Sequence, residues 1–298
     1  MALAFADILQ CPICAGRLTE KDGVCTCPAD GEFPVVRGQP VLVDFENSIL
    51  DRDYLLASTG DSPIKRRRRS FFRGVFFNGS NKVAPRIAAK FVEALPQDAR
   101  VLVVGGGTVG EGADLLYETF PRVVGTDIYA SEHTSVIADG HKLPFIDGSF
   151  DAVWIQAVLE HVLDPAQVVA EIWRVLRPGG LVFADTPFMQ QVHEGAYDFT
   201  RFTLSGHRWL FRKFDLIEAG SSGGVGVALI WSIRYFAYTI TRSGKMGRLA
   251  STLVFWLRFF EGKGRMATDA ASGVYFYGSK SNYELRPKEI VSFYNSMS

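Results

Sequence analysis

The ten residues VLVVGGGTVG (101–110) set the architecture of this chain. The first four are apolar and three of them are β-branched, which predicts a strand buried on both faces, as in a parallel sheet. The glycines that follow permit a sharp turn and a close approach of the backbone to a ligand, because glycine has no Cβ. A helix is expected next, and its free N–H groups and positive dipole end suit an anion.

Strand and helix patterns alternate outward from this turn. Helices are expected at 113–118 and at 166–176, and the second has apolar residues at helical spacing until RPGG (177–180) ends it. Strands are expected at 101–104, 123–126, 135–138, 152–156, 181–184 and 274–278. The alternation predicts the α/β class with a doubly wound parallel sheet, in which ligands bind at the carboxyl ends of the strands.

Length and composition are those of a globular protein. The 298 residues suffice for one large domain and an appendage, and contents of 47% hydrophobic and 21% charged residues argue against a mainly disordered chain. The chain has 32 basic and 32 acidic residues, so its net charge is zero. A general nucleic-acid binder usually has a basic excess, because phosphate neutralisation drives its affinity. The charge balance therefore weighs mildly against that class.

The cysteines are confined to the amino-terminal end, all four between Cys11 and Cys27. A secreted disulfide framework would usually be spread across the whole domain. The first residues, MALAFADILQ, lack the cationic start of a secretion signal. We therefore expect a reducing compartment, the cytoplasm.

Three regions are expected along the chain. Residues 1–45 form a small cysteine-bearing module, 46–95 a helical connection and 96–285 the main domain, with a helical insertion at about 224–262. The insertion is rich in large apolar residues. The longest uncharged stretch there, Ala219–Ile233, falls short of the roughly 20 residues that a membrane-spanning helix needs.

Further motifs follow the glycine turn. Asp127 ends the second expected strand, where a carboxylate can accept the hydroxyl groups of a ribose. Gly105, Gly107 and Gly110 satisfy the dinucleotide fingerprint G-x-G-x-x-G, so these features alone fit several nucleoside cofactors. Two more specific stretches come next, DGHKLPFIDGSFD (139–151) and LRPGG (176–180).

In this order the motifs resemble class I S-adenosylmethionine (SAM)-dependent methyltransferases. The core of that family commonly reads as a glycine loop, an acidic strand end, D-x-x-x-L-P-F-x-D-x-S-F-D and L-R-P-G-G, and the resemblance covers about Arg100 to Ala184. It implies a Rossmann-like, mostly parallel seven-stranded sheet and SAM as the cofactor. Because the cofactor carries the activated methyl group, the protein would mainly orient the acceptor and exclude water.

The resemblance also assigns the cofactor site residue by residue. Asp127 would hold the ribose, and Asp139 would accept a hydrogen bond from the adenine amino group. Ile128 and His141 would border the ring, and Gln156 would face the methionine end. The other positions assigned to the cofactor site are Gly105, Gly106, Gly107 and Gly140.

Three residues are candidates for the chemistry. His161, in the stretch LEHV (159–162), is expected at the mouth of the site, as a base or as a hydrogen-bonding group that shapes it. The stretch TPFMQQVHEGAYDFTRFT (186–203) is similar to the H…Y-D-[YFW]-x-R-[YF]-T stretch of methyltransferases from sugar and cell-surface polysaccharide pathways. On that resemblance His193 and Tyr197 would recognise the acceptor. Alternatively, Asp198 and Arg201 form an ion pair that only anchors the loop.

The cysteines indicate a zinc ribbon. Cys11-x-x-Cys14 and Cys25-x-Cys27 supply four thiolates, the ligands of a closed tetrahedral zinc site. The metal would contribute on the order of 10–16 kcal/mol to folding, by analogy with zinc-finger peptides. The module resembles the zinc-ribbon activators of transfer-RNA methyltransferases, in which the second pair is usually C-x-x-C. Here either Cys25 or Asp30 completes the set, and Cys25 is favoured.

Two surface features leave alternatives open. The run KRRRR (65–69) precedes Phe71-Phe72 and is either a solvated helix face or a contact for an anionic acceptor, a phospholipid headgroup or RNA. The apolar segment at 224–260 is interpreted as helices that cover the acceptor side, with an in-plane membrane contact as the alternative.

The sequence therefore predicts a SAM-dependent methyltransferase that methylates an oxygen, or less readily a nitrogen, of a small-molecule or glycan-like acceptor. One alternative is a ribosomal or transfer-RNA methyltransferase, because ribosomal RNA guanine methyltransferases also join a zinc module to this fold. A second is an NAD-dependent oxidoreductase, which the fingerprint G-x-G-x-x-G permits. A third is a binding module that has lost activity. The acceptor, the methylated atom and the oligomeric state are not given by the sequence.

Overall fold

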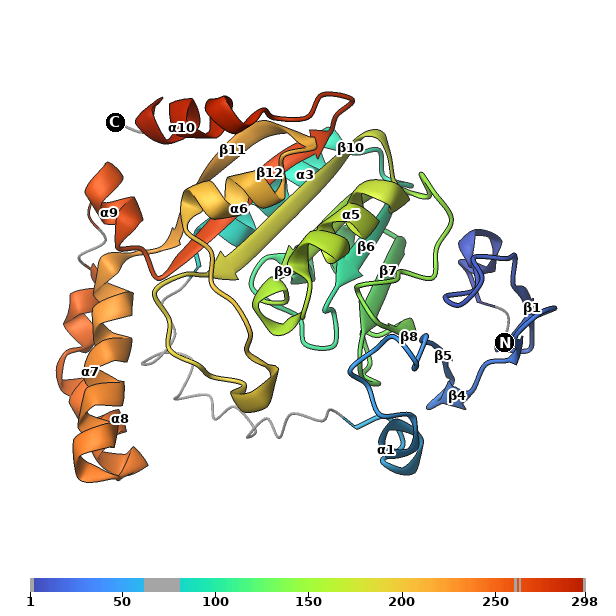
Figure 1. The fold of residues 1–298 in the computed structure, drawn as a ribbon, viewed down its shortest axis with the longest axis horizontal. Helices are drawn as coiled ribbons and strands as arrows, with labels where there is room; N and C mark the ends of the chain where they lie inside the picture. The colour runs from blue at the N-terminus through green and yellow to red at the C-terminus, as the bar shows by residue number, and fades with distance from the viewer. Residues whose placement is uncertain (1–2, 62–80, 260–261, 263, 297–298) are drawn as a thin grey trace.

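The computed structural model describes residues 3–61, 81–259, 262 and 264–296 (Figure 1). The large sheet is built from β4 (Val35–Val36), β5 (Gln39–Leu42), β6 (Arg100–Val104), β7 (Arg122–Asp127), β8 (Val136–Ala138), β9 (Phe150–Gln156), β10 (Leu176–Pro187), β11 (Phe214–Gly223) and β12 (Gly273–Lys280). A small antiparallel sheet consists of β1 (Thr19–Lys21), β2 (Val24–Cys27) and β3 (Gly31–Glu32).

The helices lie between and around these strands. The α-helices are α1 (Arg52–Ala57), α3 (Val83–Ala94), α4 (Ala113–Thr119), α5 (Pro165–Val175), α6 (Leu204–Leu210), α7 (Val225–Thr241), α8 (Gly244–Leu253), α9 (Arg265–Asp269) and α10 (Pro287–Ser296). Short 3₁₀ turns are η1 (Ala6–Ile8), η2 (Leu159–His161), η3 (Gly195–Tyr197) and η4 (Phe255–Phe259). None of the helices described here is both long and apolar enough to cross a membrane.

The strand order is β11-β12-β10-β9-β6-β7-β8-β5-β4. Strands β10, β9, β6, β7 and β8 run parallel, and β12 and β11 add to them in antiparallel fashion. These seven strands confirm the predicted doubly wound, mostly parallel sheet. The sequence pattern did not locate β11, because most of this edge strand is exposed or half-buried and its residues do not alternate in polarity.

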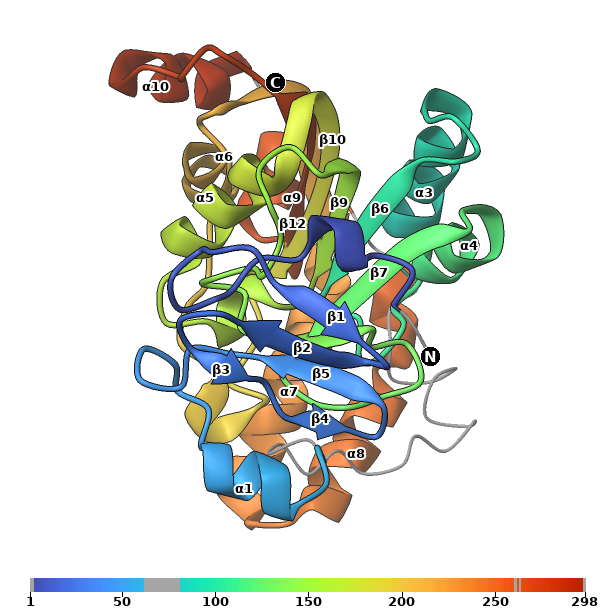
Figure 2. The same ribbon diagram turned by 90° about the vertical axis from the view of Figure 1, so that its right-hand side faces the viewer.

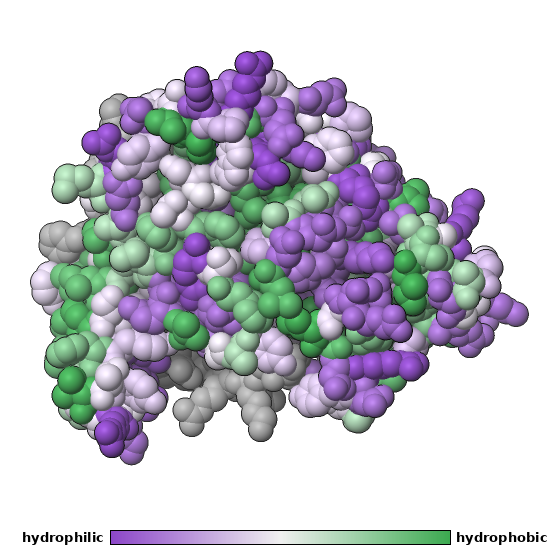
Figure 3. Space-filling model, in the orientation of Figure 1, coloured by the Kyte–Doolittle hydropathy of each residue, from purple (hydrophilic) through white to green (hydrophobic). Residues whose placement is uncertain are grey.

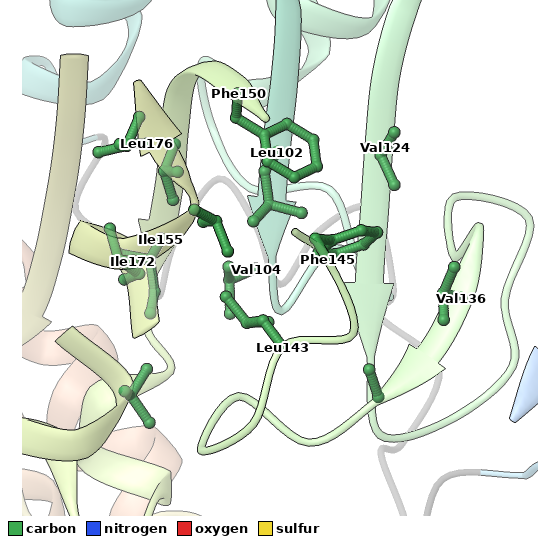
Figure 4. Packing of buried hydrophobic residues seen from close by; sticks show 14 of the residues in the cluster. Leu102, Val104, Val124, Val136, Leu143, Phe145, Phe150, Ile155, Ile172 and Leu176 are labelled. Atoms are coloured by element: carbon green, nitrogen blue, oxygen red, sulfur yellow. The ribbon is translucent and has the colours of Figure 1, made fainter. Parts of the chain in front are cut away.

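Helices lie on both faces of the sheet (Figure 2), and an apolar cluster is buried on each face. On one face, α3 and α4 pack through Phe91 and Leu116 against residues such as Trp154. On the other face, α5 contributes Ile172 to a cluster that includes Leu102 and Phe145 (Figure 4). The predicted helices were correct to within a residue or two. Helix α5 begins at Pro165 because the Asp164 carboxylate accepts the N–H groups of the first turn.

The amino-terminal residues join both the sheet and the core. Strand β5 pairs in parallel with β8, Val41 opposite Ile137, and β4 pairs with β5, so these two strands extend the seven-stranded sheet to nine. Leu9 forms a bridge with Phe145, and both side chains belong to one buried cluster. The region boundaries at residues 45 and 95 stay predictions. The first 45 residues nevertheless share their packing with the main domain.

Glu218 ties the edge of the sheet to α3. Its carboxylate accepts from Arg86 and from Lys90, whose Nζ lies 2.6 Å from Oε2, and also from the hydroxyl of Tyr275. The hydrogen bond from Arg86, with those from Lys90 and Tyr275, lowers the pKa of Glu218 to about 2. The edge strand β11 is therefore held by charged hydrogen bonds as well as by its ladder with β12.

We expect Glu218→Gln to lower the free energy of unfolding by about 1–3 kcal/mol at neutral pH, because charge-assisted hydrogen bonds are lost. The pKa of Glu218 is depressed in the folded state, so its contribution is present above the ordinary value of 4.5 and is lost as pH falls towards 2. Urea unfolding at pH 7 and pH 3 measures both effects. The exposed Glu93→Gln is the matched control, and equal destabilisation at both pH values would contradict the prediction.

Candidate active site

The turn after β6 requires glycine. Gly105 has a φ of 78°, and its N–H, like that of Gly106, donates to the carbonyl of Thr126. A Cβ at Gly105 would also overlap the side chain of Val158. A Cβ at Gly107 would lie 2.6 Å from Oδ2 of Asp127. The turn is therefore bare backbone at the carboxyl edge of the sheet, where the sequence predicted it.

Asp127 connects this turn to the end of β7. Its Oδ2 accepts the N–H of Gly107 at 2.8 Å, and its Oδ1 accepts the N–H of Ile128 at 2.7 Å. A carboxylate has roughly four acceptor positions, so these two bonds are compatible with accepting a ribose hydroxyl as well. The Ile128 side chain packs beside Ala130 and Ile137. Asp127 and Ile128 thus lie beside the glycine turn as expected.

Gln156 and Asp185 stand at the ends of β9 and β10. Nε2 of Gln156 lies 3.5 Å from Oδ2 of Asp185, while its Oε1 is buried and has no hydrogen-bond partner among the described residues. A Cβ at Gly110 would overlap that oxygen, so Gln156 faces the glycine loop. Burial raises the pKa of Asp185 to about 6, and Asn81 donates to its carboxylate.

The sequence interpretation did not single out Asp185. An available signal was its position, an acid near the carboxyl end of the fifth parallel strand, at the same edge as Asp127.

Asp139 is already engaged by two side chains. His141 donates to Oδ1 from its backbone N–H at 3.0 Å and from Nδ1 at 2.6 Å, and Ser48 donates to Oδ2. Burial alone would raise the pKa of Asp139, but the bonds from His141 and Ser48 outweigh it and lower the pKa. Ser48 lies in the connection after the first module and was not predicted to reach this site. The adenine role of Asp139 stays a prediction.

His141 bridges two parts of the site. While Nδ1 donates to Asp139, Nε2 accepts the backbone N–H of Asp164 at 3.0 Å, just before α5. Next to it, Gly140 faces Val168 of α5 at ordinary van der Waals distance. His141 therefore joins Asp139 to the start of α5, and the cofactor roles of Gly140 and His141 stay predictions.

His161, His193 and Tyr197 come together above this edge. Nδ1 of His161 donates to the carbonyl of Tyr197 at 2.7 Å, and the rings of His161 and His193 lie 4.9 Å apart. The loop at 188–203 reaches η2 through the N–H of Phe199, which donates to the carbonyl of Glu160 at 2.8 Å. The structure thus assembles the three predicted catalytic positions from segments separated in sequence.

The ion pair between Asp198 and Arg201, which was the alternative interpretation of this loop, is also present. Arg201 contacts both oxygens of Asp198, and Asp198 in turn accepts the backbone N–H of His193 at 2.9 Å. This partly buried pair therefore holds the backbone of His193 directly. Loop anchoring and a role for His193 in the site are compatible.

Glu160 is fully buried beside His161. Both of its side-chain oxygens are without a hydrogen-bond partner among the described residues, and Oε1 lies 3.5 Å from Nε2 of His161. Burial raises the pKa of Glu160 to about 8 and lowers the pKa of His161. One ligand atom from each of Glu160, His161 and His193 lies within 4.8 Å of the others, so this group could hold a divalent cation. The sequence offered one signal for Glu160, since it is an acidic residue directly before His161.

The cysteine cluster differs from the predicted ligand set. Oδ2 of Asp30 lies 3.1 Å from Sγ of both Cys11 and Cys27, and Sγ of Cys14 lies 3.5 Å from that of Cys27. Asp30, not Cys25, is thus the fourth member of the group. Cys25 precedes Cys27 by two residues along β2, so their Cα atoms are about 6–7 Å apart, and its sulfur is not part of the group. Three sulfurs and one carboxylate still form a donor set that zinc accepts.

The glycine turn and the strand-end acids lie at the carboxyl edge of a doubly wound sheet, which is where such sheets bind their ligands. Residues 102–184 match the methyltransferase domain family. This segment contains the glycine turn, Asp127, Asp139, Gln156 and His161.

Three curated relatives align with this part of the chain. A protein of Mycolicibacterium smegmatis described as a probable SAM-dependent methyltransferase is 40% identical, over 29% of this chain and 37% of its own length. The C-methyltransferase UbiE of Desulfotalea psychrophila is 35% identical, over 28% of this chain and 40% of its own length. The malonyl-[acyl-carrier protein] O-methyltransferase of Laribacter hongkongensis is 31% identical, over 35% of this chain and 43% of its own length. The chain thus spans less than half the length of these relatives.

Two solved structures are similar to this chain at low sequence identity. Phosphoethanolamine N-methyltransferase 2 of Haemonchus contortus has a TM-score of 0.49 at 16% identity, covering 80% of this chain and 61% of that one. A chain from the complex between the Haloferax volcanii Trm112 methyltransferase activator and a methyltransferase has a TM-score of 0.44 at 20% identity, covering 72% and 100%. Both TM-scores are below 0.5, so neither likeness carries an argument about this chain.

We expect Glu160→Gln to stabilise the protein increasingly as pH rises. The pKa of Glu160 is raised from 4.5 to about 8, so the wild type loses stability through this window as its buried carboxyl must ionise on unfolding. The glutamine variant has no such loss. Its free energy of unfolding should exceed that of the wild type by an amount that grows between pH 5 and pH 8, on the order of 1–4 kcal/mol.

Urea unfolding at several pH values measures this difference, with the exposed Glu118→Gln as control. A difference that does not change with pH would show that the carboxyl group is already ionised in the folded protein, as it would be with a bound cation.

Proposed function

We propose that the chain is a SAM-dependent methyltransferase acting on a small-molecule or glycan-like acceptor, with an oxygen as the methylated atom. The observation that carries the proposal is the bond from the glycine turn at Gly107 to the strand-end carboxylate of Asp127, inside a segment that matches the methyltransferase domain family. The relatives that align with this segment include enzymes named for C- and O-methylation. The choice of oxygen therefore depends on the site and not on them.

The residues at the carboxyl edge fit the cofactor. The turn at Gly105–Gly107 follows β6 at the carboxyl edge of the sheet, where ligands of doubly wound sheets bind, and would hold the methionine part. Asp127 would hold the ribose and Asp139 the adenine amino group. Oε1 of Gln156, which has no hydrogen-bond partner in the part of the chain that the structure describes, would face the methionine end. SAM, when bound, supplies an activated methyl group on its sulfonium.

The histidine pair supports hydroxyl chemistry. Because Nδ1 of His161 donates to the Tyr197 carbonyl, Nε2 of the neutral ring carries the lone pair. Burial lowers the pKa of His161, which keeps the ring neutral and able to accept a proton from an acceptor hydroxyl. His193 and Tyr197, held by the loop, would orient that acceptor. A hydroxyl needs such a base, because it is not ionised at neutral pH.

The rival functions have weaker support. An RNA methyltransferase would be favoured by the basic run at 65–69, which lies outside the described residues, and is disfavoured by the zero net charge. An NAD-dependent oxidoreductase shares the glycine fingerprint but does not account for the family match over 102–184. A non-catalytic module has no reason to assemble His161 with His193 at 4.9 Å.

Calorimetric titration with S-adenosylhomocysteine and, separately, with NADH tests the cofactor. We expect micromolar affinity for the former only, and about a tenfold or larger loss in Asp127→Ala, because charge-assisted hydrogen bonds to the ribose are removed. The exposed Asp98→Ala should bind like the wild type. Asp127→Asn keeps an acceptor at the glycine turn and separates loss of ligand contact from loosening of the loop.

Binding of NADH instead, or of neither compound, would reject the methyltransferase proposal. Once binding is established, labelled SAM allows hydroxylated sugars and RNA to be compared as acceptors.

The cysteine cluster supports a structural zinc ion. We propose Cys11, Cys14, Cys27 and Asp30 as its ligands, with the four cysteines reduced in a cytoplasmic protein. The metal would stabilise a module that has little core of its own apart from its contact with the main domain.

Metal analysis of the purified protein should find about one zinc per chain in the wild type and in Cys25→Ala. Asp30→Ala and Cys27→Ala should retain much less, because each removes a ligand. Zinc well below one equivalent in the wild type would reject the site. If Cys25→Ala loses its zinc and Asp30→Ala retains it, the four cysteines are the ligands.

A further inference from the structure

The segment from α7 to η4 has an unusual charge composition. From Val225 to Phe259 it contains no aspartate or glutamate, whereas the whole chain has equal numbers of acidic and basic residues. Five cations are distributed along it: Arg234, Arg242, Lys245, Arg248 and Arg258. This part of the fold is therefore locally cationic in a chain that is neutral overall.

Helices α7 and α8 pack together as a hairpin through small residues. A Cβ at Gly247 would lie only 2.8 Å from the carbonyl oxygen of Arg234, and Ser251, one turn further along α8, is also buried. Close packing at this seam directs the large side chains of both helices outward. The hairpin projects from the body of the molecule beyond the carboxyl edge of the sheet (Figure 1).

The outward faces are apolar. On α7, Phe236 and Ile240 are one turn apart and each is 70% exposed. On α8, Met246, Leu249 and Leu253 follow at spacings of three and four residues, and Leu253 is 69% exposed. Nearly half of the large apolar side chains exposed on the described chain lie in this segment, and they colour the hairpin green in Figure 3.

Such a face is not explained by the fold of a single soluble chain, because apolar patches of this kind usually mark an interaction site. An apolar stripe flanked only by cations is typical of helices that lie in the plane of a membrane, with the cations facing anionic headgroups. None of the described helices could span the bilayer. A partner protein would more commonly meet such a face with acids, whereas an anionic lipid surface matches both its apolar side chains and its charge.

The hairpin is joined directly to the loop that carries the candidate acceptor residues. The hydroxyl of Tyr235 donates to the carbonyl of Val192 at 2.8 Å. Nε2 of Gln191 lies 3.1 Å from the hydroxyl of Ser232. Both contacts lie immediately before His193, so the position of α7 and the position of the acceptor loop are coupled.

We propose that the exposed face of the α7–α8 hairpin docks on an anionic membrane surface and so brings the site to an acceptor anchored in the membrane. Docking is a property of the hairpin alone. The nature of the acceptor rests on the proposed function, which a separate titration with S-adenosylhomocysteine tests. The substrate class would be an amphiphile, whose hydrophilic part reaches His193 and Tyr197 while its lipid part stays in the bilayer.

Vesicle flotation tests the docking. The wild type should float with vesicles of equal parts phosphatidylcholine and phosphatidylglycerol, and much less with phosphatidylcholine alone. The double variant Phe236→Ser/Ile240→Ser should lose about tenfold or more in partitioning, because two large side chains no longer insert. Arg242→Gln/Lys245→Gln should weaken binding to the anionic vesicles only, and high salt should mimic it.

The matched control is Val291→Ser on α10, an exposed apolar residue outside the hairpin. Unchanged affinity for S-adenosylhomocysteine in all variants would show that the cofactor site is intact, so loss of flotation would report docking alone. The proposal is overturned if the wild type stays with the vesicle-free fraction, or if the Phe236→Ser/Ile240→Ser variant floats as well as the wild type. A third outcome would also overturn it. In that outcome, sedimentation velocity shows that the wild type is a dimer that does not float with the vesicles, and that the Phe236→Ser/Ile240→Ser variant is a monomer.

Discussion

The site depends on the left-handed turn at the end of β6. Gly105 takes a positive φ, the N–H groups of Gly105 and Gly106 both bond to the carbonyl of Thr126, and the N–H of Gly107 bonds to the carboxylate of Asp127. Two neighbouring parallel strands are thus joined at their carboxyl ends by backbone donors. A Cβ at any of these three glycines would overlap a neighbouring side chain, so the close packing of the protein against this turn requires glycine.

Other parts of the chain converge on that edge. The connection after the first module supplies Ser48, which donates to Asp139, and the start of α3 supplies Asn81, which donates to Asp185. The amino-terminal residues are held there by β5 on β8 and by packing of Leu9 against Phe145. A cysteine-bearing module with little core of its own is therefore stabilised by the sheet that it extends. It is part of the architecture of the site and not a separate attachment.

Buried carboxyl groups on the acceptor side serve two different purposes. Asp198 is paired with Arg201, which together with other bonds lowers its pKa to about 2, and it holds the backbone of His193. Glu160 has no such partner among the described residues, and burial raises its pKa to about 8. An ionised carboxylate that fixes the loop thus lies near a neutral carboxylic acid that faces His161. Because the loop is also bonded to α7, the hairpin, the loop and the histidines form one connected group.

The sequence by itself determined the features that depend on neighbouring residues. An apolar β-branched run followed by glycines predicts a buried strand and its turn, and the positions of Asp127 and α5 follow from local pattern. Features that depend on distant residues were decided only by the tertiary structure. Asp30 takes the place expected for Cys25 because Cys25 lies two residues away from Cys27 along β2 and its sulfur stays outside the group, although the local spacing allowed both. Ser48, Glu160 and Asp185 gained their roles from burial and from partners far along the chain. Strand β11 escaped detection because an exposed edge strand has no apolar periodicity, and its place is set by its ladder with β12.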